Sequence, residues 1–273
     1  MNYRHSFHAG NFADLVKHAL LLWLIARRRA AGPLSVVDTH AGAGLYDLSG
    51  DAARSKEAEA GVARLMTAAG RPPLIEALAQ AVAALNPDGG ARFYPGSPRL
   101  VGDRLGEGGR YVGYELNPPV LDLLKEALKG VAGAEARPGD GYEALPEALK
   151  GLRAPLVLID PPFERPDDYV RTAETAARIM RAQPSATVAI WTPLKDLETF
   201  DGFIRRLEAA KAGPTLVAEA RLRRLNDPMR MNGCAITVVN PPPGAEAAAR
   251  EICDWVVETL GEDGGRAEIW RVG

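Results

Sequence analysis

The chain has little cysteine and no spacing typical of a metal site. Its 273 residues contain two cysteines, Cys234 and Cys253. Neither belongs to a CxxC pair or to a cysteine and histidine group with zinc-ligand spacing. We therefore expect neither a disulfide framework nor a metal site. This cysteine usage suits a reducing, cytoplasmic environment.

The N-terminal region lacks a hydrophobic run long enough to cross a bilayer. Its apolar run, residues 19–26, has eight residues, whereas a membrane-spanning helix needs about 20. Arginines at 27–29 follow this run in place of a small-residue cleavage site, so a secretory signal is not expected either. Length and periodicity instead predict a buried helix, and we expect no membrane association.

Neither sign of charge is in large excess. Lysine and arginine number 33 and aspartate and glutamate 35, so the net charge is −2. This balance neither indicates nor excludes a nucleic-acid partner, because a basic face can sit on a neutral protein. Arginine clusters at 27–29 and 221–230 are in themselves typical of solvated helix faces or strand edges.

Short apolar runs that end in turn-forming or acidic residues recur along the chain. They read LSVV, RYVGYE, APLVLI, ATVAIW and GCAITVV. Amphipathic helical stretches at 120–128 and 166–180 lie between them. Strands that alternate with helices are typical of βαβ units and a parallel sheet. The sequence therefore predicts an α/β fold.

The stretch between the first and second predicted strands is too long for a simple crossover, which needs only one helix. Residues 48–91 are rich in alanine, arginine and glutamate, are interrupted by Pro72 and Pro73, and close with turn residues at 86–90. We predict two or three surface helices that form an inserted subdomain over 48–91. The main domain would then comprise residues 1–47 and 92–273.

The loop after the first predicted strand reads DTHAGAG, residues 38–44. Gly42 and Gly44 permit close backbone approach, and such a loop at the carboxyl end of a strand receives nucleotide-like ligands. It is neither GxGxxG nor GxxxxGK[ST], so it favours neither dinucleotide nor P-loop chemistry.

Two further acidic positions support a nucleoside-containing ligand. Glu115 ends the second predicted strand, where it could accept hydrogen bonds from ribose hydroxyls; a helix-capping carboxylate is the alternative. Asp140 and Gly141 follow another short strand, and a carboxylate there could contact an adenine amine. The three loops together resemble those of Rossmann-like S-adenosylmethionine-dependent methyltransferases.

The stretch LVLIDPPFE, residues 156–164, carries the predicted chemistry. The apolar run delivers Asp160 to the sheet edge, and the two prolines fix φ and remove N–H donors. The Asp160 carboxylate and the Pro161 carbonyl are then rigid acceptors for the two hydrogens of an exocyclic amine, which frees its lone pair for attack on a sulfonium methyl. Phe163 would stack on the base, worth about 1–3 kcal/mol. The alternative is an Asp-capped turn with Phe163 in the core.

A second candidate for this motif is Asn240, which precedes prolines after the run ITVV. It lacks the aromatic residue, since Pro243 occupies that position. The order of the predicted strands also favours residues 156–159 as the strand before the catalytic loop. We therefore interpret residues 240–243 as a turn that ends a late strand.

Several motifs together resemble the RlmJ family of bacterial 23S ribosomal RNA adenine-N6 methyltransferases. They are YRHSFHAGNFADLVKH, DTHAGAGLY, YPGSPRL, GYELNP, GDGYEAL and DPPFE. The resemblance runs from Tyr3 to at least Gly233. It implies a Rossmann-like methyltransferase fold with a helical insertion. It also implies methyl transfer from S-adenosylmethionine to N6 of one adenine in naked or partly assembled large-subunit RNA.

The resemblance also implies roles for single residues. Asp160 is the expected catalytic acceptor, with Pro161 and Phe163 beside it; the family often has tyrosine where Phe163 stands, so only an optional hydrogen bond is lost. Together with Gly42 of the glycine loop, the residues expected around S-adenosylmethionine are His18, His40, Ser97, Glu115, Asp140, Gly141 and Asp160. The residues expected near the target base and its phosphate are Tyr3, His5 and Lys17.

The opening segment then carries polar and aromatic groups to the substrate. A helix predicted at 13–29 anchors it by burying Leu15, Leu20, Leu22, Trp23 and Leu24. Lys17 and His18 are adjacent, so they point to different sides of that helix. For His5 and His8 a plain surface position is the alternative.

Two other functions remain open from the residues. One is an N6-adenine DNA methyltransferase, which uses the same kind of Asp-Pro-Pro loop. The other is a non-catalytic RNA-binding module on the same fold. We expect a monomeric, cytoplasmic enzyme whose partner is 23S ribosomal RNA.

Overall fold

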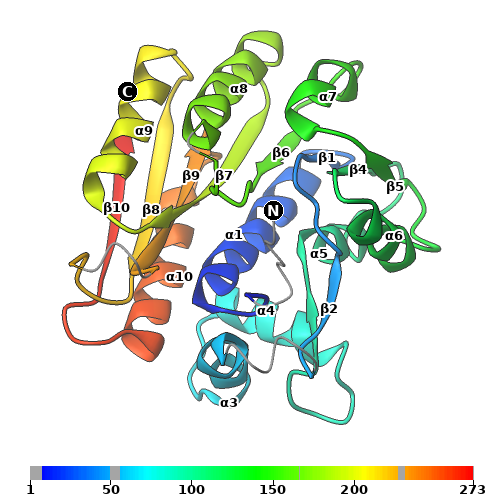
Figure 1. The fold of residues 1–273 in the computed structure, drawn as a ribbon. Helices are drawn as coiled ribbons and strands as arrows, with labels where there is room; N and C mark the ends of the chain where they lie inside the picture. The colour runs from blue at the N-terminus through cyan, green and yellow to red at the C-terminus, as the bar shows by residue number, and fades with distance from the viewer. Residues whose placement is uncertain (1–7, 50–55, 166, 227–230, 273) are drawn as a thin grey trace.

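The computed structural model describes residues 8–49, 56–165, 167–226 and 231–272. In this part of the chain, helices cover both faces of a central sheet (Figure 1). The strands are β1 Ser35–Asp38, β2 Leu45–Asp47, β3 Phe93–Pro95, β4 Arg110–Glu115, β5 Ala134–Pro138, β6 Leu156–Ile159, β7 Thr187–Leu194, β8 Thr215–Arg221, β9 Gly233–Val239 and β10 Arg266–Val272.

The main sheet has eight strands in the order β10-β8-β9-β7-β6-β1-β4-β5. The run from β5 to β7 is parallel. Chain order reverses at β1, which has β4 on one side and β6 on the other, and this reversal is the hallmark of a Rossmann-like sheet. The predicted α/β, Rossmann-like fold is therefore confirmed.

The prediction of a parallel sheet is wrong on one side of the sheet, where β9 and β10 run antiparallel to their neighbours. β9 follows β8 with no helix in the described residues between them, and strands joined without a crossover element pair antiparallel. The sequence analysis also missed β8. This strand is buried throughout, yet it contains Glu219 and Arg221, which pair at 2.6 Å inside the protein and look like surface residues in the sequence.

The helices surround this sheet in two layers. Their bounds are α1 Phe12–Arg29, η2 Glu59–Ala63 (a π-helical turn), α3 Arg64–Thr67, α4 Pro73–Ala83, α5 Ser97–Gly102, α6 Pro118–Ala127, α7 Gly141–Ala148, α8 Asp168–Ala182, α9 Leu197–Ala209 and α10 Ala245–Leu260. The stretches predicted as helical at 13–29, 120–128 and 166–180 correspond to α1, α6 and α8. None of these helices is both long enough and apolar enough to cross a bilayer.

Helix α1 begins at the N-cap Asn11, whose side chain accepts hydrogen bonds from the backbone N–H groups of Ala13 and Asp14. The helix packs against the sheet on one side and against α4 and α10 on others. Being enclosed in this way, it buries Leu15, Leu20, Leu22 and Leu24 as predicted, whereas Trp23, also predicted to be buried, is only half-buried. This enclosure explains the continuous apolar run.

The predicted insertion is helical, with η2, α3 and α4 between the antiparallel strands β2 and β3. Its helices have exposed outer faces and buried inner faces. Leu65, Ile75 and Leu78 are fully buried and belong to the same core as α1. The boundaries of a 48–91 subdomain therefore stay a prediction, while the packing ties this segment to the start of α1.

Gly61 sets how closely the insertion approaches the turn before α1. A Cβ at residue 61 would lie 2.2 Å from the Gly10 carbonyl oxygen. That oxygen accepts a hydrogen bond from the Val62 N–H at 2.8 Å. We predict that Gly61→Ala lowers the free energy of unfolding by about 1–3 kcal/mol, because overpacking forces the backbone apart. Urea unfolding measures the change.

Gly202 in α9 provides the matched control, since a Cβ there meets nothing within 4 Å. Gly202→Ala is expected to raise the free energy of unfolding by about 0.5–1 kcal/mol, because alanine is the better helix former. A change of the same sign in both variants would contradict the close approach described for Gly61.

Candidate active site

Acidic residues gather where the parallel strands end. Asp38 ends β1, Glu115 ends β4, and Asp140 and Asp160 follow β5 and β6. The carboxyl ends of parallel strands meet at one edge of a sheet, and the reversal of chain order beside β1 opens a crevice there. The candidate site therefore lies at this edge, with a carboxylate from each of four neighbouring strands.

Asp38 is the most deeply buried of these carboxylates. One of its oxygens accepts hydrogen bonds from the Ser97 hydroxyl at 2.7 Å and from the Tyr111 hydroxyl at 3.3 Å. Burial raises the pKa of Asp38 to about 6, and the nearby charge of Asp160 adds to the effect. The sequence analysis did not assign Asp38 to the site; its place directly before the glycine loop was the available signal.

The glycine loop is held by Glu115. The N–H of Gly42 donates to one Glu115 oxygen at 3.2 Å, and the N–H of Asn117 donates to the other at 2.8 Å. Gly42 has φ +65°, and a Cβ there would lie 2.5 Å from the Tyr46 hydroxyl, so only glycine fits. Glu115 thus caps the turn before α6 and also faces the loop.

Asp140 and Gly141 bring the start of α7 to the same loop. Asp140 caps α7 through the N–H of Tyr142 at 2.9 Å and accepts from Arg171 at 2.7 Å. Although burial opposes it, the Arg171 guanidinium holds the pKa of Asp140 below its usual value. A Cβ on Gly141 would lie 2.2 Å from the carbonyl oxygen of Thr39, so this approach requires glycine.

His40 lies between these groups. Its ring meets that of Tyr142 edge-on, with centroids 4.8 Å apart, and its Nδ1 lies 2.8 Å from the Thr39 hydroxyl. Burial lowers the pKa of His40 to about 4. The imidazole is therefore neutral at pH 7 and acts as a hydrogen-bonding group without charge.

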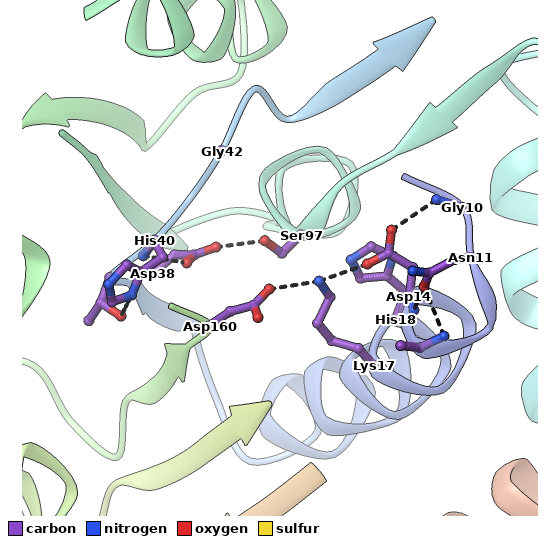
Figure 2. A network of polar contacts seen from close by, with 12 residues as sticks. Gly10, Asn11, Asp14, Lys17, His18, Asp38, His40, Gly42, Ser97 and Asp160 are labelled. Carbon is purple, nitrogen blue, oxygen red and sulfur yellow. Dashed lines mark hydrogen bonds and ion pairs between the residues drawn. The ribbon is translucent and has the colours of Figure 1, made fainter. Parts of the chain in front are cut away.

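Asp160 forms an ion pair with Lys17 of α1 (Figure 2). The Lys17 ammonium lies 2.7 Å from an Asp160 oxygen and 2.8 Å from an oxygen of Asp14. Burial works against the charge of this ammonium, but the two carboxylates overcome it and raise the pKa of Lys17 well above its ordinary value. Lys17 is therefore a permanent cation at the site.

The residues after Asp160 form a stiff turn. Pro161 is buried, and Phe163 is half-buried with φ +49°, in the left-handed region that costs a bulky residue about 1–3 kcal/mol. The Phe163 ring packs against those of Tyr169 and Trp191, with centroids 4.5 and 6.0 Å away. The strained backbone at Phe163 thus accompanies a ring that is held by two other aromatic side chains.

The competing Asn240 motif lies at the opposite ends of the strands, next to the beginning of β7. Its strand β9 is antiparallel to β7, so Val239 pairs with Val188 near the beginning of β7. The Asn240 amide donates to the Ala186 carbonyl at 2.7 Å, which places it before that strand. The interpretation of residues 240–243 as a turn that ends a late strand is confirmed.

The structure brings most of the predicted site residues together at one edge: Lys17, His40, Gly42, Ser97, Glu115, Asp140, Gly141, Asp160, Pro161 and Phe163. His18 points elsewhere on α1, as its adjacency to Lys17 predicts, and its Nδ1 lies 2.8 Å from the Tyr94 hydroxyl. His8 pairs with Glu57 at 2.9 Å. Tyr3 and His5 lie outside the described residues.

A cavity extends from this site between α1 and the sheet. Lys17, Asp38, Ser97 and Asp160 form its polar part, and leucines of α1 line its apolar part. Trp191 of β7 also lines it. The sequence analysis missed Trp191, because a tryptophan within an apolar strand has the pattern of a core residue.

The chain is similar to ribosomal RNA methyltransferases along most of its length. Residues 31–272 match the model of the family described as Ribosomal RNA large subunit methyltransferase D, RlmJ. The Ribosomal RNA large subunit methyltransferase J of Escherichia coli (strain K12) is 32% identical over 263 residues, which covers 95% of this chain and 94% of that protein. The protein of the same name from Haemophilus influenzae is 29% identical over 268 residues, with coverage of 97% and 95%.

A solved structure from Legionella pneumophila has the same fold. Its protein LPL1258 superposes with a TM-score of 0.87 at 24% identity, and the match covers 96% of this chain and 98% of that one. The family model spans most of the chain, and the Escherichia coli relative is similar over nearly its full length. The chain therefore belongs to the ribosomal RNA large subunit methyltransferase family RlmJ.

Proposed function

We propose that this enzyme transfers a methyl group from S-adenosylmethionine to the N6 amine of one adenine in 23S ribosomal RNA. Family membership supports a ribosomal RNA of the large subunit as the substrate class. The observation that carries the proposed chemistry is the position of Asp160. It stands at the carboxyl end of β6 and is paired with Lys17. Pro161, Pro162 and Phe163 follow it in the chain.

The residues at this edge fit S-adenosylmethionine. Three carboxylates, from Asp38, Glu115 and Asp140, match a ligand that carries an ammonium group, ribose hydroxyls and an adenine amine. Gly42 and Gly141 let the loops around the site pack closely against their neighbours, because a Cβ at either position would collide with the protein. Besides Asp38, the residues proposed to hold the cofactor are His40, Gly42, Ser97, Glu115, Asp140, Gly141 and Asp160. For His18, which is buried with its Nδ1 2.8 Å from the Tyr94 hydroxyl, a place beside the cofactor stays a prediction.

The cofactor, when bound, supplies an electrophilic methyl group on a positively charged sulfur. The task of the protein is to present the adenine amine. The Asp160 carboxylate and the Pro161 carbonyl accept its two hydrogens, which draws the nitrogen lone pair out of the ring and makes it nucleophilic. The Lys17 ammonium, 2.7 Å from an Asp160 oxygen, holds this carboxylate in place at the site.

Positioning supplies the larger part of the acceleration under this proposal, because the amine and the methyl group are held in line. Phe163 is proposed to stack on the adenine, which requires the base to leave its helix. An unpaired or looped adenine in naked or partly assembled large-subunit RNA suits this requirement. We also propose that the enzyme works as a monomer in the cytoplasm. Lys17, Tyr3 and His5 are proposed to contact the target base and its phosphate.

We predict that Asp160→Ala loses methyl transfer by at least about 100-fold, because the amine loses its acceptor and its position. Cofactor affinity is expected to stay within about tenfold, since one contact among several is removed. Transfer of labelled methyl to ribosomal RNA and calorimetric titration of S-adenosylmethionine measure the two quantities.

Asn240→Gly is the control for this prediction. It alters the competing motif at residues 240–242, which lies at the opposite ends of the strands, and glycine accepts the positive φ of residue 240, +53°. Methyl transfer near the wild-type rate is expected. Near-normal transfer by Asp160→Ala would exclude the assigned role.

A pH dependence of cofactor binding is expected from Asp38, whose pKa burial raises to about 6. Above that pH the group is a carboxylate that attracts the positive charges of S-adenosylmethionine, and below it the group is protonated and neutral. The dissociation constant is therefore predicted to rise by up to about tenfold for each pH unit below this pKa. The Asp38→Asn variant should bind S-adenosylmethionine weakly, with a dissociation constant that does not change with pH. The same pH dependence of this constant in the variant and the wild-type protein would contradict the prediction.

The substrate is tested directly by mass mapping of nucleic acids from cells that lack the protein. We expect one adenine of 23S ribosomal RNA to lose its methyl group. Parallel incubation of ribosomal RNA and DNA with labelled cofactor separates this proposal from a DNA methyltransferase. A purified protein that neither binds S-adenosylmethionine nor labels RNA would instead be a binding module.

A further inference from the structure

We propose that Asp14 is a positioning residue for methyl transfer, holding the Lys17 ammonium in place against Asp160. The inference rests on the proposed function, because it concerns the same catalytic carboxylate. Asp14 touches neither the base nor the cofactor in this proposal. It acts through Lys17, from the first turn of α1.

The carboxylate of Asp14 is buried and fully engaged. Its side chain is 5% exposed, and one oxygen lies 2.8 Å from the Lys17 ammonium. The other oxygen accepts a hydrogen bond from the N–H of Gly10 at 2.9 Å. Figure 2 shows the resulting chain of contacts, which runs from Gly10 through Asp14 and Lys17 to Asp160.

Two carboxylates hold a lysine more firmly than one. A lysine side chain has a flexible four-carbon stem, so an ammonium held by a single ion pair can still occupy several positions. Here Asp14 and Asp160 both lie within 2.8 Å of the nitrogen. The Asp160 carboxylate, in turn, is directed by an ammonium that cannot move without breaking its bond to Asp14.

The charges support the same role. Asp14, Asp160 and Lys17 together carry one net negative charge, so Asp160 keeps part of its charge free to accept hydrogen bonds from an amine. Without the Asp14 charge, the ammonium would be satisfied by Asp160 alone and would neutralise it. Asp160 would then be a weaker acceptor, because the positive charge beside it would no longer be shared with a second carboxylate.

Asp14 also joins the site to the turn before α1. Gly10 donates to Asp14, and the Gly10 carbonyl accepts from Val62 of the insertion. A plain stabilising role for Asp14, as an acidic residue in the first turn of a helix, predicts an effect on unfolding but none on the chemical step.

Asp14→Asn separates the two roles. The asparagine oxygen can still accept from the Gly10 N–H, while the charge that holds Lys17 is gone. We expect the single-turnover rate of ribosomal RNA methylation, with RNA and S-adenosylmethionine saturating, to fall about tenfold or more, since small errors of position are costly to catalysis. The dissociation constant for S-adenosylmethionine and the KM for RNA should stay within about twofold.

Asn11→Ala is the matched control. It removes the N-cap of α1 and is expected to cost about 1 kcal/mol of stability, while it leaves the contact between Asp14 and Lys17 in place. Its single-turnover rate should stay within about twofold of wild type. If Asp14→Asn does not fold, Asp14→Ser, which is smaller and retains an acceptor oxygen, takes its place in the same assay.

The outcomes are distinct. Slow chemistry in Asp14→Asn with unchanged binding and a normal Asn11→Ala supports the inference. A normal rate in Asp14→Asn, or equal slowing in both variants, overturns it while the proposed function stands. A wild-type protein that does not methylate ribosomal RNA overturns the proposed function, and the inference falls with it.

Discussion

The ammonium of Lys17 lies between the carboxylates of Asp14 and Asp160, and this contact joins the first helix to the catalytic edge of the sheet. Three aspartates meet here, since the charge of Asp160 also reaches the buried Asp38. Without a cation among them they would repel one another in a region of low dielectric. Removing one charged partner from a buried group of charges lowers the free energy of unfolding by more than an exposed ion pair raises it.

The position of this cation depends on the way α1 is packed. The helix is enclosed by the sheet, α4 and α10, and its buried leucines share one core with the insertion. The close approach of Gly61 to Gly10 fixes the turn from which α1 starts, and Asp14 binds the N–H of that same Gly10. Insertion, helix start and catalytic carboxylate therefore form one continuous structure.

Much of the site follows from strand order alone. Each acidic or glycine-rich loop comes directly after a predicted strand, and parallel strands end at one edge, so Glu115, Asp140 and Asp160 were expected to gather there. Asp38, which ends β1 at the same edge, was not assigned to the site from the sequence. The apolar run of α1 likewise predicted a buried helix. The burial of α3 and α4 was not predictable, because alanine-rich amphipathic segments look alike whether they face solvent or another helix.

The sequence by itself determined the local elements, the Asp-Pro-Pro-Phe turn and the family resemblance, because these depend on neighbouring residues and their spacing. Only the tertiary structure decided the partners of Lys17, and it gave the physical reason why Asn240, already interpreted as part of a turn, lies away from the site. Residues 17 and 160 are 143 positions apart in the chain, and local propensity carries no information about their pairing. Asn240 is excluded by the direction of β9, which is set by its pairing with β7 and β8.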